Sequence, residues 1–485
     1  MEGNRSRGRG AVRSGLLTGI STAVVSGSAA ILGVILSRKF GHGVRTDGFF
    51  AAYGVYLALT LVASSLRVVV LPRFVVARGE ERLGAEVGAW ALALAVPLLA
   101  AVVVAIAASD AIARALTSES EARTEAARLI PWVICSAAAQ IYGGLVASAL
   151  AALDDYEWTA IGFAVGSAAG VGVTLALVGH GVIAFGWGLA VNGAVSLAVP
   201  LAALALRQSL AWPAERSPRR LLELAEGVSL PLALQGLYVI GYRFASGLGA
   251  GRATTFSYAY RIAAFLVAVT ASSIALVTTV PFAREGLSPT RAARHVVAIS
   301  WLSLVPVGAA AGVFALAGET VVHRALGAGY GGGTGAQLGR LVVYLSPWIV
   351  VSVALTVAYP LVFVRGRAWW LPALSIGALL VQVLVEWVLQ RWLGLAGVAA
   401  GIAVTTGAVL AVLLTVLRSL RRVVAGLAVA AGVCGGVAVV AFGLPRLAFA
   451  AVPAAAVGVV AYALVLIVWR PAGLRHAWAY VRALE

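Results

Sequence analysis

The chain has 485 residues, a mean hydropathy of +0.97, 11% charged residues and a net charge of +17. A soluble core of this length could not hide so much apolar surface, because even large domains leave much of it exposed to water. The basic residues lie in short loops between apolar segments, which is typical of a membrane protein and argues against a nucleic-acid partner. The composition therefore predicts an all-α polytopic protein of the lipid bilayer.

Fourteen apolar segments are long enough, at about 20 residues, to cross a bilayer as helices. We expect the first to be retained, since its apolar run is longer than that of a cleavable signal peptide. The predicted spans are 14–36, 48–71, 86–108, 129–153, 158–179, 181–206, 221–248, 255–280, 295–317, 337–364, 368–390, 394–417, 423–443 and 447–469.

The spans group into two predicted lobes. The expected parts are a basic tail (1–13), an N-lobe of six spans (14–206), a cytoplasmic linker (207–220), a C-lobe of six spans (221–417), and two further spans with a C-terminal tail (418–485). Lys and Arg are more frequent in the loops on the side of the two termini, which predicts both termini in the cytoplasm. On the outer side we expect a short amphipathic surface helix within 109–128 and a flexible glycine-rich loop at 318–336.

One stretch of the N-lobe recurs in the C-lobe. Residues 46–74 (TDGFFAAYGVYLALTLVASSLRVVVLPRF) align with 254–282 (TTFSYAYRIAAFLVAVTASSIALVTTVPF), so that Thr46, Ser64 and Phe74 match Thr254, Ser272 and Phe282. A membrane helix that recurs half a chain later predicts two pseudo-symmetric lobes, which is typical of transporters.

Both repeated helices carry a polar stripe. The stripe of the second span is Tyr53, Tyr56, Thr60, Ser64 and Arg67, and that of the eighth span is Thr254, Tyr258, Arg261, Ser272 and Thr279. Each set lies on one helical face, and polar side chains within a bilayer should face the protein interior or a water-filled cavity. We therefore expect both stripes to face a shared central cavity.

Two arginines stand out within the predicted spans. Arg243 and Arg261 both lie roughly 8–9 Å inside the outer ends of adjacent helices, at about 1.5 Å per residue. With no embedded acid between them, they favour an anionic partner such as phosphate, which matches the guanidinium fork. The alternative is that an arginine near a helix end extends to the headgroups, which we expect for Arg67 and Arg340 and leave open for Arg243.

Two acidic residues are further candidates. Asp47 lies at the outer mouth of the second span, where a surface salt bridge with nearby basic residues and a gating or positioning role are both open. Glu386 lies deep in the eleventh span with Gln382 on the same face. It could carry a proton or an ion, or it could pair with an arginine elsewhere.

No catalytic or metal-binding constellation is apparent, and no cofactor is expected. The histidines are scattered, and Cys135 and Cys434 fall in apolar segments as core residues do. The acidic cluster Asp154, Asp155 and Glu157 could bind a metal or a nucleotide-sugar in a glycosyltransferase, but a solvated tight turn is the favoured interpretation.

Two motifs resemble a known family. A helix that ends at SRKFG, followed by TDGFFAAY with Thr46, Asp47, Phe49, Phe50 and Ala52, and the later SYAYRI with Tyr258, Ala259 and Arg261, resemble lipid II flippases of the MurJ/MviN type. That family belongs to the multidrug/oligosaccharidyl-lipid/polysaccharide exporter superfamily, with O-antigen flippases and MATE exporters. The resemblance implies essential roles for Asp47 and Arg261.

The resemblance also implies a fold and a cargo. The family has two six-helix lobes around a central cavity, and its last two helices form a groove for a lipid tail. The cargo would be a polyprenyl-diphosphate-linked sugar that crosses from the inner to the outer leaflet of the bacterial plasma membrane by alternating access. Ion or membrane-potential coupling would drive it, in peptidoglycan biosynthesis, cell-wall biogenesis and the maintenance of cell shape.

One departure leaves the cargo open. The family places arginines in its first helix and in the middle of its second, whereas 14–36 has no charge and the second span reads LALTLVASS. The alternatives are a MATE-like drug or metabolite exporter, an O-antigen or teichuronic-type polysaccharide flippase, a membrane glycosyltransferase, or a non-transporting scaffold. We expect a transporter rather than an enzyme. The predicted substrate-binding residues are Arg261, Arg243, Asp47, Tyr53, Thr60, Ser64, Tyr258 and Ser272, with Glu386 as the ion-coupling candidate.

Overall fold

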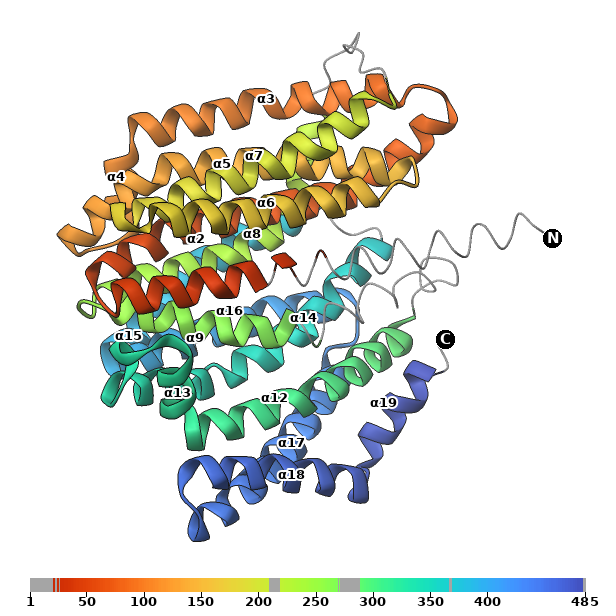
Figure 1. Cartoon of the computed structure of the whole chain (residues 1–485). Helices are drawn as coiled ribbons and strands as arrows, with labels where there is room; N and C mark the ends of the chain where they lie inside the picture. Colours follow the sequence, from red (N-terminus) through yellow and green to blue (C-terminus); the bar gives the residue numbers. More distant parts are fainter. Residues whose placement is uncertain are drawn as a thin grey trace. The chain divides into compact units, whose positions relative to one another are not determined.

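The computed structural model describes residues 21, 24–25, 27–208, 219–268, 270, 288–365 and 369–482, and all regular structure in them is helical (Figure 1). Within these ranges, eleven helices are long and apolar enough to cross a membrane, or up to twelve if one bent pair is a single span. The all-α multi-pass fold is thus confirmed, whereas the count of fourteen spans is not. Parts of the first and eighth predicted spans and most of the linker lie outside the described residues.

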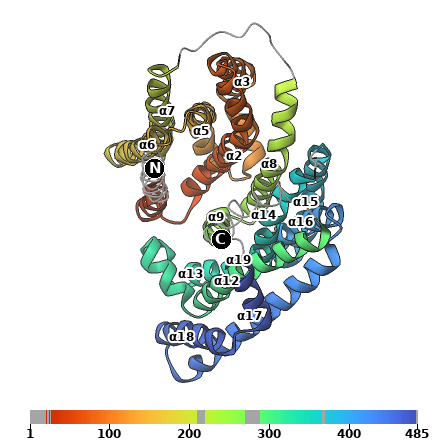
Figure 2. The same ribbon diagram turned by 90° about the vertical axis from the view of Figure 1, so that its right-hand side faces the viewer.

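The chain divides into two compact units, Met1–Val239 and Ile240–Glu485. The N-terminal unit contains a helix at 27–40, α2 (Val44–Gly79), α3 (Leu83–Ala107), α4 (Ser109–Leu116), α5 (Ser120–Ala152), α6 (Glu157–Leu177), η1 (Val178–His180), α7 (Ile183–Ala205) and the first part of α8 (Arg219–Ser246). Helix α5 is its centre, with α2, α3 and α7 packed around it (Figure 2). The predicted surface helix at 109–128 is α4 followed by the first turns of α5.

Helices α6 and α7 approach closely because small residues line their contact. Gly162, Gly166 and Gly170 recur every fourth residue on one face of α6. A Cβ atom on Gly170 would lie 2.7 Å from the Gly188 carbonyl oxygen of α7, and one on Gly166 would lie 2.9 Å from that of Asn192. In a bilayer, van der Waals packing between closely spaced backbones holds helices together, so these glycines fix the α6–α7 pair.

We expect Gly170→Leu to destabilise the N-terminal unit by about 1–3 kcal/mol or more, because overpacking would push the α7 backbone away. The change would be measured as a lower thermal unfolding temperature of the purified chain in detergent. Gly172→Leu is the matched control, since a Cβ atom there meets nothing within 4 Å. Equal unfolding temperatures for the two variants would show that the close approach of α6 and α7 contributes little.

In its described residues, the C-terminal unit contains the end of α8 and ten further elements. They are α9 (Arg252–Val267), α12 (Pro289–Leu326), η3 (Ala328–Tyr330), α13 (Gly333–Tyr344), α14 (Ser346–Val364), α15 (Leu371–Leu393), α16 (Leu395–Val416), α17 (Leu420–Ala448), α18 (Ala451–Trp469) and α19 (Ala472–Arg482). Helix α12 packs against α13, α14, α17, α18 and α19, and α15 pairs with α16.

The glycine-rich stretch 318–336 differs from its prediction as a flexible loop. Helix α12 continues to Leu326, Tyr330 is fully buried, and helix resumes at Gly333. A Cβ atom on Gly339 would lie 3.0 Å from the Cα atom of Gly318, so these glycines serve close packing of α13 on α12. The predicted span 337–364 is the bent pair α13 and α14, with an angle of 43° between them.

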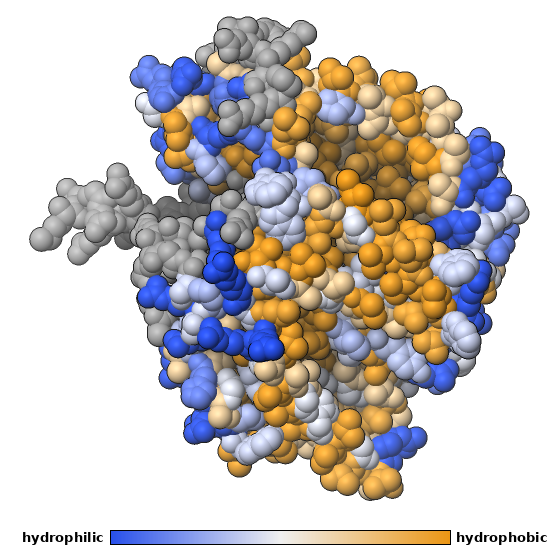
Figure 3. All heavy atoms as spheres, turned by 180° about the vertical axis from the view of Figure 1, so that it is seen from behind, coloured by the Kyte–Doolittle hydropathy of each residue, from blue (hydrophilic) through white to orange (hydrophobic). Residues whose placement is uncertain are grey.

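The surface agrees with a membrane location. On the face drawn in Figure 3, hydrophobic residues cover the middle, and hydrophilic residues gather at two opposite margins. Many large apolar side chains are exposed on α3, α15, α17 and α18, among them Val96, Leu384, Val439 and Val468. Exposed apolar patches of this extent are unusual on soluble monomers, and the bilayer would cover them.

Candidate functional site

Asp47 lies in the first turn of α2 and is buried, with 1% of its surface exposed. The adjacent Thr46 is also buried and donates a hydrogen bond from Oγ1 to the Gly41 carbonyl at 3.0 Å. Arg45, one of the basic residues near Asp47 in sequence, pairs with Glu121 of α5 at 3.9 Å on the exposed surface. Asp47 is therefore packed within the protein at the start of α2 and is not a solvated surface group.

The residues of the predicted polar stripe on α2 differ in their surroundings. The Tyr53 ring stacks on Phe49 at 5.3 Å and packs against Tyr56 at 5.4 Å. Thr60 is half-buried and donates to the Leu57 carbonyl of its own helix at 3.0 Å, whereas Arg67 is exposed, as its predicted extension to the headgroups requires. The side chain of Ser64 lies outside the described part of the structure.

Arg243 and Arg261 lie on neighbouring helices of the C-terminal unit, and both are half-buried. Arg243 is in the last turn of α8, and Arg261 is in the middle of α9. The turn between the helices contains Gly249 and Gly251 with φ angles of 114° and 76°, values that favour glycine. A short turn therefore joins the helix that carries Arg243 to the helix that carries Arg261.

Aromatic residues fix the face of α9 that carries Arg261. Tyr258 is 6% exposed and meets Tyr330 edge to face at 5.5 Å, and Tyr260 packs on Trp348 of α14 at 4.8 Å. These contacts hold the first turns of α9 rigidly within the unit. Ser272, the predicted partner further along the stripe, lies outside the described residues.

Glu386 and Gln382 form a buried polar pair on α15. Both are fully buried, and Gln382 Nε2 donates to Glu386 Oε1 at 2.6 Å. A Cβ atom on Gly401 of α16 would lie 2.8 Å from the Glu386 carboxyl carbon, so only glycine leaves room for that carboxylate. Within the described residues, Glu386 Oε2 and Gln382 Oε1 have no hydrogen-bond partner, and Glu386 has no ion pair.

Thr405 of α16 lies one helical turn beyond Gly401 and is a further candidate that the sequence did not suggest. Helices α15 and α16 run antiparallel, with Leu389 opposite Gly397 and Glu386 opposite Gly401, so Thr405 falls at the level of Gln382. Its hydroxyl is fully buried and has no partner among the described residues. Uncompensated buried oxygens are costly, and a proton or a small cation would relieve that cost.

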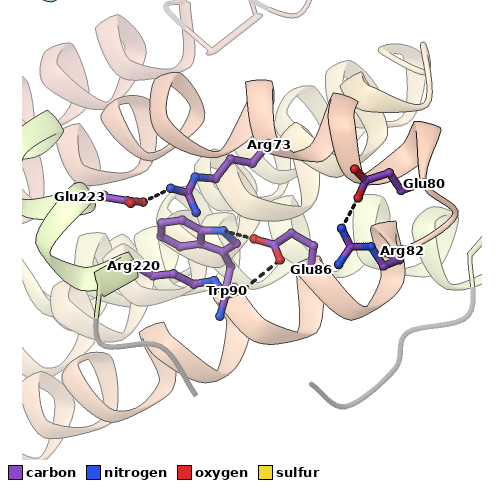
Figure 4. Close-up of polar contacts among 7 residues, drawn as sticks. All are labelled: Arg73, Glu80, Arg82, Glu86, Trp90, Arg220 and Glu223. Atoms are coloured by element: carbon purple, nitrogen blue, oxygen red, sulfur yellow. Dashed lines mark hydrogen bonds and ion pairs between the residues drawn. The ribbon is translucent and has the colours of Figure 1, made fainter. Parts of the chain in front are cut away.

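A second polar cluster joins α8 to α2 and α3 within the N-terminal unit (Figure 4). Arg220 donates to Glu86 at 2.9 Å, Trp90 Nε1 donates to the same carboxylate at 3.1 Å, and Arg73 pairs with Glu223. Arg73, Glu86 and Arg220 border a pocket of about 790 Å³. Acids and bases alternate and balance in this cluster, so we interpret it as an anchor for the start of α8.

The two aspartates of the acidic cluster after α5 form ion pairs. Asp154 pairs with Arg78 at 2.7 Å, and Arg78 also donates to the Ala152 carbonyl at 2.7 Å. Asp155 pairs with Arg207. In the described residues no group of three or more His, Cys, Asp or Glu side chains could hold a metal ion. These contacts agree with the interpretation of a tight turn.

An apolar groove of about 770 Å³ lies in the C-terminal unit between α12, α14 and α17. Its walls include Gly308, Gly312, Val350, Cys434 and Phe442. Gly308 and Gly312 make room for the side chains of Tyr462 and Phe442. The lining is almost entirely hydrocarbon, so the groove suits an acyl or isoprenoid chain. The resemblance implies that the last two spanning helices, α17 and α18, form a groove for a lipid tail. Only α17 of these two lines the groove described here.

The fold of this chain is similar to the folds of solved MOP-superfamily transporters. Over 94% of this chain and 99% of the other, the structure is similar to the lipid II flippase MurJ in an inward closed conformation, with a TM-score of 0.75 and 13% identity. It is also similar to an inward-facing multidrug resistance transporter of the MATE family, with a TM-score of 0.65 and 16% identity over 82% of this chain and 94% of the other.

A third similar structure is a MOP-superfamily transporter from Pyrococcus furiosus, with a TM-score of 0.56 and 15% identity over 86% of this chain and 96% of the other. At the level of sequence, no protein-family model and no curated protein matches this chain. At these identities the likeness shows a multi-pass helical fold shared with those proteins, in agreement with the resemblance seen in the two motifs.

Proposed function

We propose that the chain is a flippase that moves a polyprenyl-diphosphate-linked glycan precursor, of the lipid II kind, from the inner to the outer leaflet of the bacterial plasma membrane. The observation that carries this proposal is the likeness to a lipid II flippase over nearly the whole of both chains. The family-like motifs at Asp47 and Arg261 support it independently, because they come from sequence and not from fold.

In this proposal Arg261 and Arg243 bind the diphosphate. Both guanidinium groups are half-buried, so their hydrogen bonds to phosphate would be less weakened by water than those of surface arginines. Polar side chains of the two repeated helices would contact the sugar or line its path. These are Asp47, Tyr53, Thr60, Ser64, Tyr258 and Ser272.

The polyprenyl chain would lie in the apolar groove between α12, α14 and α17. That groove offers a continuous hydrocarbon lining, and the transfer of each CH₂ group out of water is worth about 0.8 kcal/mol. A lipid tail could stay in such a groove while the polar head crosses the bilayer. Glu386, with Gln382 and Thr405, would take up the coupling proton or cation.

Depletion of the protein tests the proposal. We expect a polyprenyl-diphosphate-linked glycan to accumulate on the inner leaflet of depleted cells, and its chemical identity would name the cargo. The measurement is extraction and mass spectrometry of lipid-linked species, combined with leaflet-specific labelling. Re-expression of the intact chain should reverse the accumulation, and unchanged lipid-linked pools would contradict the proposal.

A MATE-like exporter is the second candidate, because a MATE-family structure is also similar to this chain. It predicts altered drug resistance on depletion, with no accumulation of a lipid-linked precursor. A membrane glycosyltransferase is disfavoured, since Asp154 and Asp155 are engaged with arginines. Neutralising both acids should leave the pools of lipid-linked species unchanged if they only shape the turn.

A further inference from the structure

The C-terminal helix α19 folds back from the end of the last spanning helix. Helix α18 ends at Trp469, and Arg470 adopts a left-handed conformation, with φ of 43°, before α19 begins at Ala472. In Figure 1, α19 (dark blue) leaves the end of α18 at a sharp angle. A helix of 11 residues is too short to cross a bilayer, so α19 lies where a membrane surface would be.

One face of α19 is docked on α12. Gly473 approaches Trp301 so closely that no side chain fits between them, and Ala477 is buried in a cluster with Ala298 and Trp301. The Tyr480 hydroxyl oxygen lies 3.1 Å from His295 Nδ1 of α12. These contacts hold α19 against α12, so it is a packed helix of the C-terminal unit.

The neighbouring face of α19 borders a pocket of about 930 Å³. The apolar floor comes from α12 and α18 and includes Leu302, Val305 and Leu466. Arg470, Arg475 and Arg482 stand around it, and no acidic residue of the described ranges lines it. This pocket shares no lining residue with the groove between α12, α14 and α17.

The three arginines remain available for an anion. Arg475 and Arg482 are exposed and have no ion pair among the described residues, and Arg470 donates only to the Ile467 carbonyl at 3.0 Å. The Arg482 guanidinium lies 5.4 Å from the ring centroid of Trp478, which is itself 54% exposed. Tryptophan and arginine side chains at a membrane surface anchor proteins at the headgroup level.

We propose that this pocket binds one anionic phospholipid of the leaflet in which α18 ends, which the charge distribution predicts to be the cytoplasmic one. The acyl chains would cover Leu302, Val305 and Leu466, and the phosphate would lie between Arg475 and Arg482. An apolar floor beneath a cluster of positive charge matches a diacyl lipid with an acidic headgroup, and neither a free anion nor a neutral lipid satisfies both parts.

The test measures lipid bound to the purified full-length chain in neutral detergent by native mass spectrometry. Dioleoyl-phosphatidylglycerol should remain bound at one molecule per chain, and dioleoyl-phosphatidylcholine should not. Arg475→Gln with Arg482→Gln should weaken phosphatidylglycerol binding by about 10- to 30-fold, from about 1 kcal/mol for each arginine near an anionic surface. Ala463→Trp, which fills the floor and keeps the arginines, should weaken it as well.

The matched control is Arg418→Gln with Arg421→Gln. These two exposed arginines flank the start of α17, carry the same charge and do not line the pocket, so binding should be unchanged. Equal binding of the two lipids, or full binding by both pocket variants, would overturn the proposal. Displacement of the lipid by millimolar inorganic phosphate or by a polyprenyl phosphate would overturn it too, in favour of a free-anion site or a substrate site.

Discussion

Arg261→Ala is expected to abolish rescue of cells depleted of the protein, while the variant still reaches the membrane. A charge-assisted hydrogen bond to phosphate contributes about 1.5–3 kcal/mol, which corresponds to a loss of about 10- to 150-fold in cargo affinity. Arg261 is half-buried, and the packing of Tyr258 on Tyr330 and of Tyr260 on Trp348 holds the helix that carries it. The variant should therefore keep its fold and lose its anion contact.

Two comparisons separate binding from general damage. Arg261→Lys keeps the charge but loses the planar fork, so rescue should be partial. Arg340→Ala removes an exposed arginine of α13 in the same unit, and rescue should remain complete. Full rescue by Arg261→Ala would remove that residue from the proposed site, whereas loss of rescue by Arg340→Ala would point to a general need for positive charge.

Glu386→Gln is expected to uncouple transport from its driving gradient. The carboxylate is fully buried, one oxygen accepts from Gln382, and the other has no partner among the described residues. Glutamine has the same shape but cannot release a proton or attract a cation, so gradient-driven stimulation should fall by about 5- to 150-fold, as expected for a coupling free energy of 1–3 kcal/mol. The free energy of unfolding should not fall, because the substitution removes an ionisable group whose burial is itself costly.

The measurement is translocation of a labelled lipid-linked substrate in proteoliposomes, with sodium or proton gradients imposed separately. Thr405→Val should weaken the same gradient dependence, since it removes a further buried oxygen, without a partner among the described residues, at the level of Gln382. Glu319→Gln removes an exposed carboxylate of α12 and serves as the control. Unchanged gradient dependence in Glu386→Gln would leave Gln382, Glu386 and Thr405 with a structural role only.

The sequence predicted more of the local chemistry than of the packing. It placed Gln382 and Glu386 on one face of a helix, and both are buried there side by side. It did not suggest Thr405, because that residue falls at the level of Gln382 only through the antiparallel register of α15 and α16. Sequence reasoning also missed the cluster of Glu86, Trp90 and Arg220, whose members are separated by up to 134 residues.

The glycine-rich stretch before α13 shows why such limits arise. Glycine-rich segments in water favour flexible loops, and the sequence therefore predicts a flexible loop at 318–336. In the structure, Gly318 and Gly339 meet at the contact of α12 and α13, where the absence of side chains allows two helices to touch. The same residue type serves a turn in one setting and a helix contact in another, and only the neighbouring helix distinguishes them.

The amino-acid sequence by itself determined that this protein is a bundle of membrane helices, with candidate arginines and acids at particular depths. The reason is that a backbone inside hydrocarbon must satisfy its own hydrogen bonds, so each apolar segment becomes a helix whatever its neighbours are. The tertiary structure decided which helices pair, which glycines admit a partner, and where α19 folds back to leave a basic pocket. Helix pairing in a bilayer depends on shape complementarity between distant segments, and hydropathy along the chain does not record it.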